Sequence, residues 1–329
     1  MSKRGIAVFL FAASSLAMAG AARAEATVDY FGKAWVWSPS VYFSAGAVDF
    51  KRGRPANGTI IGANPGGGVP GFVNASDYNF GWHGGWDATF GFRFFQMDSV
   101  EVRFLDIATT TATLDTRSPG GFIGIGFTGP TNTAFATQYE TKLTSWEVNW
   151  RHQVFADGSI PVLDQLHVLA GVRSIHVSDN YAGQINGTVA SAVYAYDNQL
   201  LGLQIGADVG LLPKTWPVQV NAFGKIGRYH LDTSGGIFEF QGANNTFIGS
   251  FSTSQTDRVT AREVGISAGW KPWPNVLIRG GYQALWIDNI GLASANASAS
   301  LLNPSLLNTN VYRENLFFQG INFGLTISE

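Results

Sequence analysis

The sequence lacks cysteine, is poor in charge and has no long hydrophobic run after its first 24 residues. Without cysteine, neither a disulfide scaffold nor a cysteine-ligated metal site can form. Charged residues make up 13% of the 329 residues, about half of the usual share in soluble domains. The 21 basic and 23 acidic residues nearly balance, which argues against a nucleic-acid partner bound through a broad basic field. After residue 24 no run reaches the roughly 18 apolar residues that a transmembrane helix needs.

Glycine and aromatic residues are abundant instead. The chain has 40 glycines, and its 24 Phe, 10 Trp and 10 Tyr bring the aromatic share to 13%. Intrinsic disorder requires high charge and few aromatic residues, so this composition indicates a folded chain. A folded chain with so little charge is not typical of the cytosol.

The first 24 residues have the three parts of a secretory signal peptide. Lys3 and Arg4 supply the positive start, residues 5–20 are uncharged and mostly apolar, and Ala22-Arg23-Ala24 matches the small-residue cleavage site. We therefore expect export of the chain with cleavage after Ala24. The mature part, residues 25–329, is then periplasmic, secreted or inserted in an outer membrane.

Residues 80–94 alternate between apolar and polar side chains. Even positions are apolar, aromatic or glycine, whereas the odd positions include His83, Asp87 and Arg93. A period of two places these sets on opposite faces of a β-strand. Similar alternation marks further segments, so that the candidate strands lie around residues 41–50, 80–94, 100–104, 146–151, 166–173, 201–210, 218–225, 263–271, 276–283 and 321–327.

The connections between these segments alternate between short and long. The long ones fall near residues 51–78, 107–142, 178–197, 231–260 and 288–315 and are rich in small and polar residues. This layout is typical of outer-membrane barrels, which have short periplasmic turns and long extracellular loops. The sequence thus predicts an all-β fold, a transmembrane antiparallel up-and-down barrel of ten strands. Twelve strands is the alternative, because residues 121–127 and 237–251 could each add a hairpin.

Tryptophan placement favours the same fold, because aromatic girdles mark both membrane interfaces of such barrels. No amphipathic helix pattern is present that would cover the apolar strand faces of a soluble protein. The tryptophans expected near the periplasmic strand ends are Trp35, Trp37, Trp150, Trp216, Trp270 and Trp273, and those expected near the outer ends are Trp82, Trp86 and Trp286.

Four phrases in the second half resemble a known family. They are WEVNWRH at 146–152, LHVLAGVR at 166–173, NQLLGLQIGAD at 198–208 and RGGYQALW at 279–286. They are similar to a family of β-barrel porins of planctomycetes and some proteobacteria, close to the Legionella-type pore-forming outer-membrane proteins. The resemblance covers about residues 140–329 and implies an integral outer-membrane barrel of porin type. One departure is the last segment, in which Phe323 is the final aromatic residue, so the usual terminal aromatic of the assembly signal is missing.

The polar strand faces collect the charged residues that we expect to line the lumen. An open lumen would use them to set ion selectivity. A ten-stranded barrel is narrow, however, and paired charges can fill its interior, so we favour a packed polar core. The predicted lumen-lining residues are Asp87, Arg93, Glu101, Arg103, Glu147, Arg151, Arg173, Asp208, Lys225, Glu263 and Arg279.

A barrel hydrolase is a second class to weigh, because histidine is the default general base at neutral pH. The candidates near the outer strand ends form no catalytic triad that spacing can assign, and we expect no enzyme, no cofactor and no metal site. These candidates are His83, Asp87, His176, Asp179, His230, Asp232 and Asp288.

The function that the sequence favours is porin-like, with passive, low-conductance diffusion of small solutes or ions. The alternative is a non-conducting surface barrel whose loops mediate adhesion or recognition, since barrels place recognition in their loops. In either case we expect the outer membrane of a Gram-negative-type bacterium. The expected partners are outer-membrane lipids including lipopolysaccharide and the barrel-assembly machinery, and no nucleic acid.

Overall fold

The structure is a computed structural model that describes residues 27–28, 34–35, 37–56, 59–63, 73–95, 97–117, 122–124, 127–129, 134–160, 163–185, 191–212, 216–241, 246–302 and 311–328. The predicted signal peptide and its cleavage after Ala24 lie outside the described residues.

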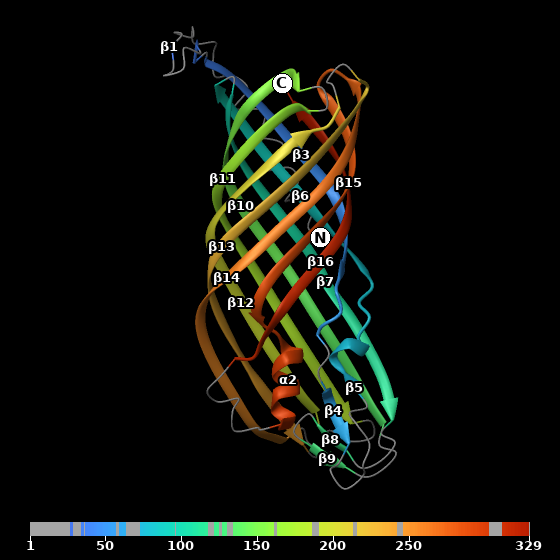
Figure 1. Cartoon of the computed structure of the whole chain (residues 1–329). Helices are drawn as coiled ribbons and strands as arrows, with labels where there is room; N and C mark the ends of the chain where they lie inside the picture. The colour runs from blue at the N-terminus through green and yellow to red at the C-terminus, as the bar shows by residue number, and fades with distance from the viewer. Residues whose placement is uncertain are drawn as a thin grey trace.

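Ten antiparallel strands close into one barrel, as the sequence predicts (Figure 1). Each strand pairs with its two neighbours in the ring, and the last strand named below pairs with the first. A closed ring leaves no free strand edge inside a membrane. The ring runs through β10 (Ala134–Ile160), β11 (Leu163–Ile185), β12 (Ser191–Gly210), β13 (Val218–Gln241), β14 (Thr246–Trp273), β15 (Val276–Gly291), β16 (Arg313–Ser328), β3 (Trp37–Arg52), β6 (Trp82–Phe95) and β7 (Asp98–Arg117).

Neither candidate hairpin adds a strand to the ring, so the alternative of twelve strands is wrong. The first forms β8 (Phe122–Gly124) and β9 (Phe127–Gly129), which belong to a separate sheet with the order β5-β4-β8-β9. The second lies mostly within β13 and β14, whose pairing continues as far as Gln241 and Thr246. Both segments therefore lie at the end of the barrel rather than adding to its circumference.

The two ends of the barrel differ. The links β6–β7, β10–β11, β12–β13 and β14–β15 lie at one end, called here the turn end, where β3 begins and β16 ends. The links β3–β6, β7–β10, β11–β12, β13–β14 and β15–β16 lie at the opposite, loop end. Figure 1 shows α2 (Ala293–Leu302), β4 (Thr59–Ala63) and β5 (Val73–Asn74) at the loop end, far from the C-terminus.

The strands are longer than the apolar alternation indicates. β10 has 27 residues and β14 has 28, whereas about 9–11 residues suffice to span a bilayer. The expected loops at 107–142, 178–197 and 231–260 are largely strand, so the links between strands shrink to residues 118–133, 186–190 and 242–245. The reason is that outward residues there are polar, so pairing continues after the hydrophobic signal stops. The wall thus continues beyond the length that a membrane needs.

The helices of the described residues are short. α2 and the 3-10 helix η1 (Ala75–Asp77) both lie in links at the loop end. Within the described parts of the chain, no helix has the length and hydrophobicity required to cross a membrane. A small hairpin of β1 (Thr27–Val28) and β2 (Ala34–Trp35) precedes the barrel.

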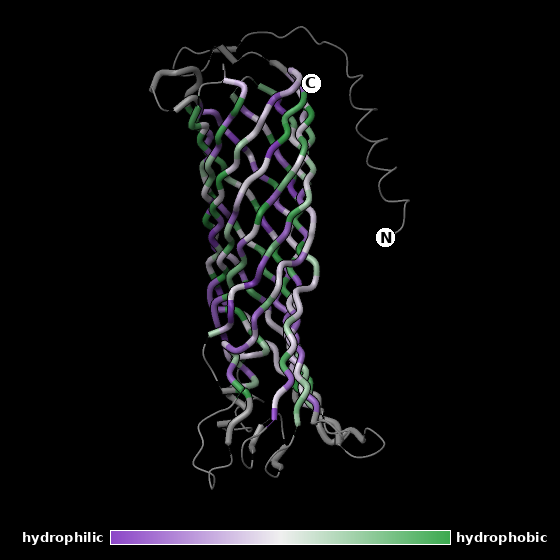
Figure 2. The backbone as a smooth tube through the Cα atoms, turned by 90° about the vertical axis from the view of Figure 1, so that its right-hand side faces the viewer, coloured by the Kyte–Doolittle hydropathy of each residue, from purple (hydrophilic) through white to green (hydrophobic). Residues whose placement is uncertain are grey.

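The outer wall carries a belt of exposed apolar side chains. Figure 2 shows hydrophobic and hydrophilic residues alternating along the strands of the wall. Leu203 is 69% exposed and Phe323 is 66% exposed. Exposure of so extensive an apolar surface to water would be unfavourable in free energy. Trp150 and Trp270 lie exposed towards the turn end, and Trp82 lies exposed towards the loop end. The belt is the part of the wall that suits hydrocarbon, and further members are Val148, Val172, Leu201, Ile205, Ile226, Val264, Ile266, Ile321, Leu325 and Ile327.

Candidate functional site

A layer of charged side chains fills the barrel interior at the level of the belt. Arg103 is at its centre: its Nη2 donates to Asp87 Oδ2 at 2.8 Å and its Nη1 donates to Glu263 Oε1 at 2.8 Å. Arg103 Nη1 also lies 3.5 Å from Glu147 Oε1. One guanidinium therefore joins carboxylates from β6, β10 and β14 across the lumen.

The other cations of this layer complete the pairing. Arg173 Nη1 donates to Glu263 Oε2 at 2.6 Å, and Lys225 Nζ donates to Glu147 Oε1. Gln204 Nε2 donates to Glu147 Oε2 at 2.6 Å. Arg103, Arg173 and Lys225 thus offset the charges of Asp87, Glu147 and Glu263, and this set is called the charge layer below. Such charges are tolerable in a low-dielectric interior only when each is paired and hydrogen-bonded.

A second group of charges lies nearer the turn end. Arg151 donates to both Glu101 and Asp208, and His167 Nδ1 lies 3.1 Å from Asp208 Oδ1. Tyr42 OH donates to Glu101. This group joins β3, β7, β10, β11 and β12, and it narrows the lumen on the turn side of the charge layer.

Two predicted lumen residues form no ion pair with these groups within the described residues, although Arg279 is close enough to interact electrostatically with Asp87 and Glu101. Arg93 is exposed, two residues from the turn end of β6. Arg279 is half-buried on β15, in register with Gly269 on β14 and Gly324 on β16. Since β6 ends at Phe95, Arg93 lies at the mouth of the barrel, where the alternation rule alone could not distinguish an inner wall from an open rim.

An apolar layer fills the interior on the loop side of the charge layer. The period-two pattern reverses here, because the inward residues are apolar whereas outward neighbours such as His176 on β11 and Asp232 on β13 are polar and exposed. Phe50 and Phe318 are fully buried in it. Its further members include Leu105, Ile107, Leu143, Ile175, Val177, Leu231, Val259, Leu285 and Ile287, all buried in one cluster.

On the loop side of the apolar layer, a buried arginine contacts a carboxylate and aromatic rings. Arg52 Nη2 lies 3.3 Å from Asp179 Oδ1 and donates to Tyr139 OH at 3.0 Å. The guanidinium carbon lies 4.5 Å from the ring centre of Phe80 and 4.4 Å from that of Tyr139, which is cation–π geometry. Burial opposes the charge, but Asp179 and Tyr139 outweigh it and raise the pKa of Arg52. Arg52 therefore remains a cation in this setting.

Three tyrosines surround this arginine site. The rings of Tyr78, Tyr139 and Tyr181 meet edge to face, with centres 5.7 to 6.0 Å apart. Tyr78 OH donates to Thr137 Oγ1 at 2.6 Å, and Tyr139 OH donates to Asp179 Oδ2 at 2.8 Å. Burial raises the pKa of Tyr78 and of Tyr139, so both phenols stay protonated.

The helix α2 covers the loop end of the barrel, on the outer side of the tyrosines. Ala293 N–H, at the helix N-terminus, donates to Asp179 Oδ2 at 2.8 Å. Asn198 Nδ2 donates to the carbonyl of Gly291 at 2.8 Å, and Asn296 Nδ2 donates to that of Tyr312 at 2.8 Å. These contacts join the β15–β16 link to β11 and β12, so that the lumen is covered as well as filled.

The structure does not assemble the candidate catalytic groups into one site. His83 Nε2 accepts a hydrogen bond from Thr111 N–H at 3.4 Å. His176 Nε2 lies 2.6 Å from Asp197 Oδ2, and Asp197 is not among the catalytic candidates predicted from the sequence. His230 Nε2 lies 3.4 Å from Asp232 Oδ1. Both of these pairs are on the exposed outer surface of the wall rather than in the mouth.

The remaining candidates are also spread over the molecule. Asp87 belongs to the charge layer, Asp179 contacts Arg52, and Asp288 lies 2.5 Å from Arg262 Nη2. Among the described residues, no group of three histidines and acids is placed to hold a metal ion. These groups therefore lie in separate contacts and not in one cluster.

No protein-family model matches the chain, and no curated protein sequence matches it. The family resemblance seen in residues 140–329 therefore stays a prediction. Solved structures do match in outline. They include the outer membrane protease OmpT from Escherichia coli (9% identity, 88% of this chain and 96% of that chain covered, TM-score 0.49) and the translocator domain of the autotransporter NalP from Neisseria meningitidis (9%, 88% and 87%, 0.38). A third is the toluene transporter TodX of P. putida (8%, 88% and 89%, 0.34). At these values the likeness goes no further than the closed antiparallel barrel.

Proposed function

We propose that this chain is an outer-membrane barrel with a closed lumen that serves at the cell surface rather than as a pore. The observation that carries the proposal is the filled interior. The charge layer, the apolar layer and the covering helix α2 succeed one another along the barrel axis. A hydrated ion would have to displace all three.

The outer-membrane location is supported by the wall. Its exposed apolar belt has tryptophans at both edges, and its strands close without a free edge. The predicted signal peptide would deliver such a chain to the periplasm. We expect the loop end to face outwards, because β3 begins and β16 ends at the turn end, and barrels place short turns on the periplasmic side.

A surface role is supported by the order at the loop end. The sheet β5-β4-β8-β9 and α2 cover the mouth, and hydrogen bonds fix α2 to the wall. Rigid scaffolds that hold defined loops are typical of recognition surfaces. Adhesion to another cell or to host material is the activity that fits this end best.

Transport is tested by the swelling of liposomes that contain the purified chain. We expect swelling in arabinose and in glycine at the rate of protein-free liposomes, with a general porin as the positive control. Rapid swelling in either solute would contradict the closed lumen.

The surface role is tested by replacing residues 118–133 with a short Gly-Asn turn. Cells that express the full chain should adhere to mucin-coated surfaces more than vector controls, and the shortened variant should lose that gain. Heat-modifiable gel mobility would show that the shortened barrel still folds. Equal adhesion by the full chain and the vector control would end the surface proposal.

A low-conductance pore is the second candidate function. It is favoured by Arg52 Nε and Nη1, which are buried and have no hydrogen-bond partner within the described part of the chain. Buried polar atoms of this kind are usually satisfied by water. Water that reached Arg52 would already have passed the cover, and slow ion passage would then require movement of the apolar layer and of the charge layer.

A further inference from the structure

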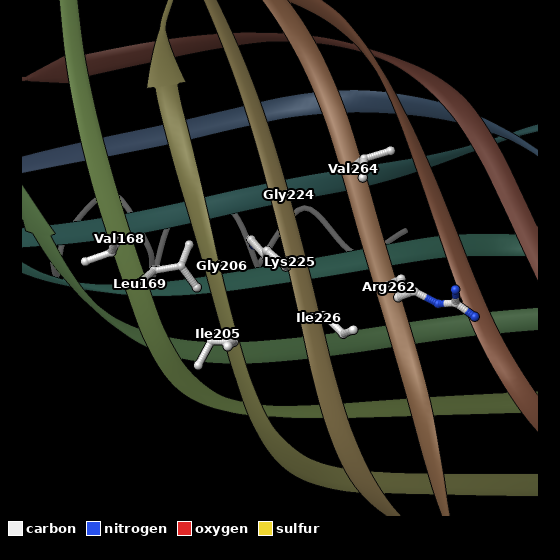
Figure 3. Close-up of a pocket in the computed structure, with 9 residues that line it drawn as sticks. All are labelled: Val168, Leu169, Ile205, Gly206, Gly224, Lys225, Ile226, Arg262 and Val264. Carbon is white, nitrogen blue, oxygen red and sulfur yellow. The ribbon is translucent and has the colours of Figure 1, made fainter.

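The outer wall of the belt is hollowed at β12 and β13. Figure 3 shows outward side chains of Val168, Ile205 and Ile226 around the hollow. The groove has a volume of about 590 Å³, and its floor is the backbone at Gly206 and Gly224. On β13 the groove exists because Gly224 has no side chain: a Cβ added there would meet only one atom, 4.0 Å away, and would project into the groove. The groove is apolar, and it faces the hydrocarbon of the membrane.

Arginines lie at the loop-side edge of this groove. Arg262 forms part of its lining, and its guanidinium points away from the hollow (Figure 3). On the same face of β14, Arg258 is four residues nearer the loop end, and Arg228 on β13 is in register with Thr260 between them. Arg228 Nη1 donates to Thr260 Oγ1 at 3.3 Å. The three arginines therefore surround one outward position of the wall.

These arginines lie at the height of the outer membrane surface. Trp270 marks the turn-side edge of the belt on β14, and Arg262 follows it on the same face after Ile266 and Val264. Eight residues of strand cover about 27 Å, or about 20 Å along the membrane normal at the usual tilt of about 40°. Since the apolar band of such barrels is about 25 Å tall, the Arg262 backbone lies about 5 Å inside its outer boundary, a distance that the long arginine side chain spans.

Acidic side chains also occur here, and they leave the patch basic. Arg262 Nη2 lies 2.5 Å from Asp288, His230 lies 3.4 Å from Asp232, and Arg313 is paired with Asp257. Arg228 contacts a threonine hydroxyl, which an anion can replace. The flanking residues on β12 are apolar: Leu203 is in register with Arg228, and Leu201 with His230.

We propose that this wall binds an acylated, phosphorylated glycolipid of the outer leaflet, with an acyl chain in the groove and phosphate against Arg228, Arg258 and Arg262. The proposal rests on the outer-membrane location proposed above, and it does not depend on whether the lumen is closed. Charge complementarity and the adjoining apolar groove select a lipid over free phosphate, because phosphate cannot fill the groove. Guanidinium groups suit phosphate oxygens, which they can contact through two hydrogen bonds at once.

Native mass spectrometry of the full chain in detergent, with bis-phosphorylated lipid A as the probe, tests the site. Dephosphorylated lipid A, phosphatidylglycerol and inorganic phosphate are the comparison ligands. The first variant is Arg228→Gln with Arg262→Gln, matched by Lys142→Gln on β10. The second is Gly224→Leu, matched by Gly84→Leu on β6, where an added Cβ also meets open space, with the nearest atom 3.9 Å away.

We expect bis-phosphorylated lipid A to bind the unaltered chain about tenfold more tightly than phosphatidylglycerol, and the double arginine variant to lose about tenfold. Gly224→Leu should lower the affinity for both lipids, and the two control variants should bind as the unaltered chain does. Equal affinity for both lipids, or arginine variants that bind like their control, would overturn the proposal. Binding of inorganic phosphate with the affinity of lipid A would also overturn it.

The folding of each variant is checked by heat-modifiable gel mobility and by insertion into liposomes. Failure of the unaltered chain to insert would refute the outer-membrane location itself. A chain that inserts and still fails to select lipid A refutes only the lipid site.

Discussion

At the scale of single residues, Glu263 has the most demanding position. Its side chain is almost fully buried and receives hydrogen bonds from two guanidinium groups, Arg103 Nη1 at 2.8 Å and Arg173 Nη1 at 2.6 Å. A buried charge network is stable only while every member is paired. Glu263 therefore holds two cations in the centre of the barrel.

Glu263→Gln tests this pairing. The amide keeps the shape but leaves Arg103 and Arg173 short of one negative charge, which should cost about 3–5 kcal/mol of unfolding free energy. Urea unfolding in detergent micelles, followed by tryptophan fluorescence, measures it. The matched variant is Arg93→Gln at the exposed rim, which should change stability by less than about 0.5 kcal/mol.

Equal stability of the two variants would contradict the account of the charge layer. Gain of stability in Glu263→Gln would show that hydrophobic contacts, and not paired charges, dominate the interior.

The sequence could predict much of this residue-scale arrangement. Alternation places Glu147, Arg173 and Glu263 on the inward faces of their strands, but it does not reveal which cation meets which acid. Strand tilt and register decide that, because Arg103 contacts Glu263 from 160 residues away. Arg52 was beyond prediction, since it follows a noisy first strand and its partner Asp179 lies in a stretch that resembles a loop.

At the scale of secondary-structure elements, α2 shows what sequence patterns miss. Its sequence, ASANASASLL, is small and polar, with no apolar stripe at helical spacing. Buried small residues replace the stripe, because Ala293, Ala295 and Ala297 pack in the barrel mouth. The backbone N–H groups of Ala293 and Gly291 donate to Asp179 and Asn198, and the helix's own Asn296 donates to the carbonyl of Leu292; these hydrogen bonds hold the segment.

Asp179→Ala should release α2 while leaving the barrel closed. The variant removes the acceptor of the Ala293 N–H and leaves Arg52 without its carboxylate. Loss of a charged hydrogen-bond partner costs about 1.5–3 kcal/mol, so amide exchange across Ala293–Leu302 should speed by one to two orders of magnitude.

Hydrogen exchange with mass spectrometry in micelles provides the measurement, and Asp197→Ala on the exposed wall is the matched control. Unchanged protection of α2 in the Asp179 variant would show that the helix is held by packing alone.

At the scale of the whole molecule, the architecture is the part that the sequence predicts best. The closed ring and the strand number follow from period-two patterns and turn residues, because each strand separates lipid from interior. The predicted alternation of link lengths holds only in part, since the links 186–190 and 242–245 at the loop end are shorter than the link 211–217 at the turn end. What the patterns miss is the height of the wall. On the loop side of the belt the outward faces of β10, β11 and β14 become polar, so the lipid-facing signal ends while the hydrogen-bonded ladder continues.

The orientation in the membrane can be tested with single cysteines, since the chain has none of its own. Ser254→Cys, exposed on β14 near the loop end, should react with a membrane-impermeant maleimide on intact cells. Asn275→Cys, in the β14–β15 turn, should react only after the outer membrane is permeabilised. The reverse pattern would place the loop end in the periplasm.

The closed lumen is the central claim, and single-channel recording in planar bilayers tests it most directly. Purified chain in 1 M KCl should give a baseline with no steady openings, because the charge layer, the apolar layer and α2 stand in series across the barrel. Frequent, long-lived openings with the conductance of a water-filled channel would contradict the account.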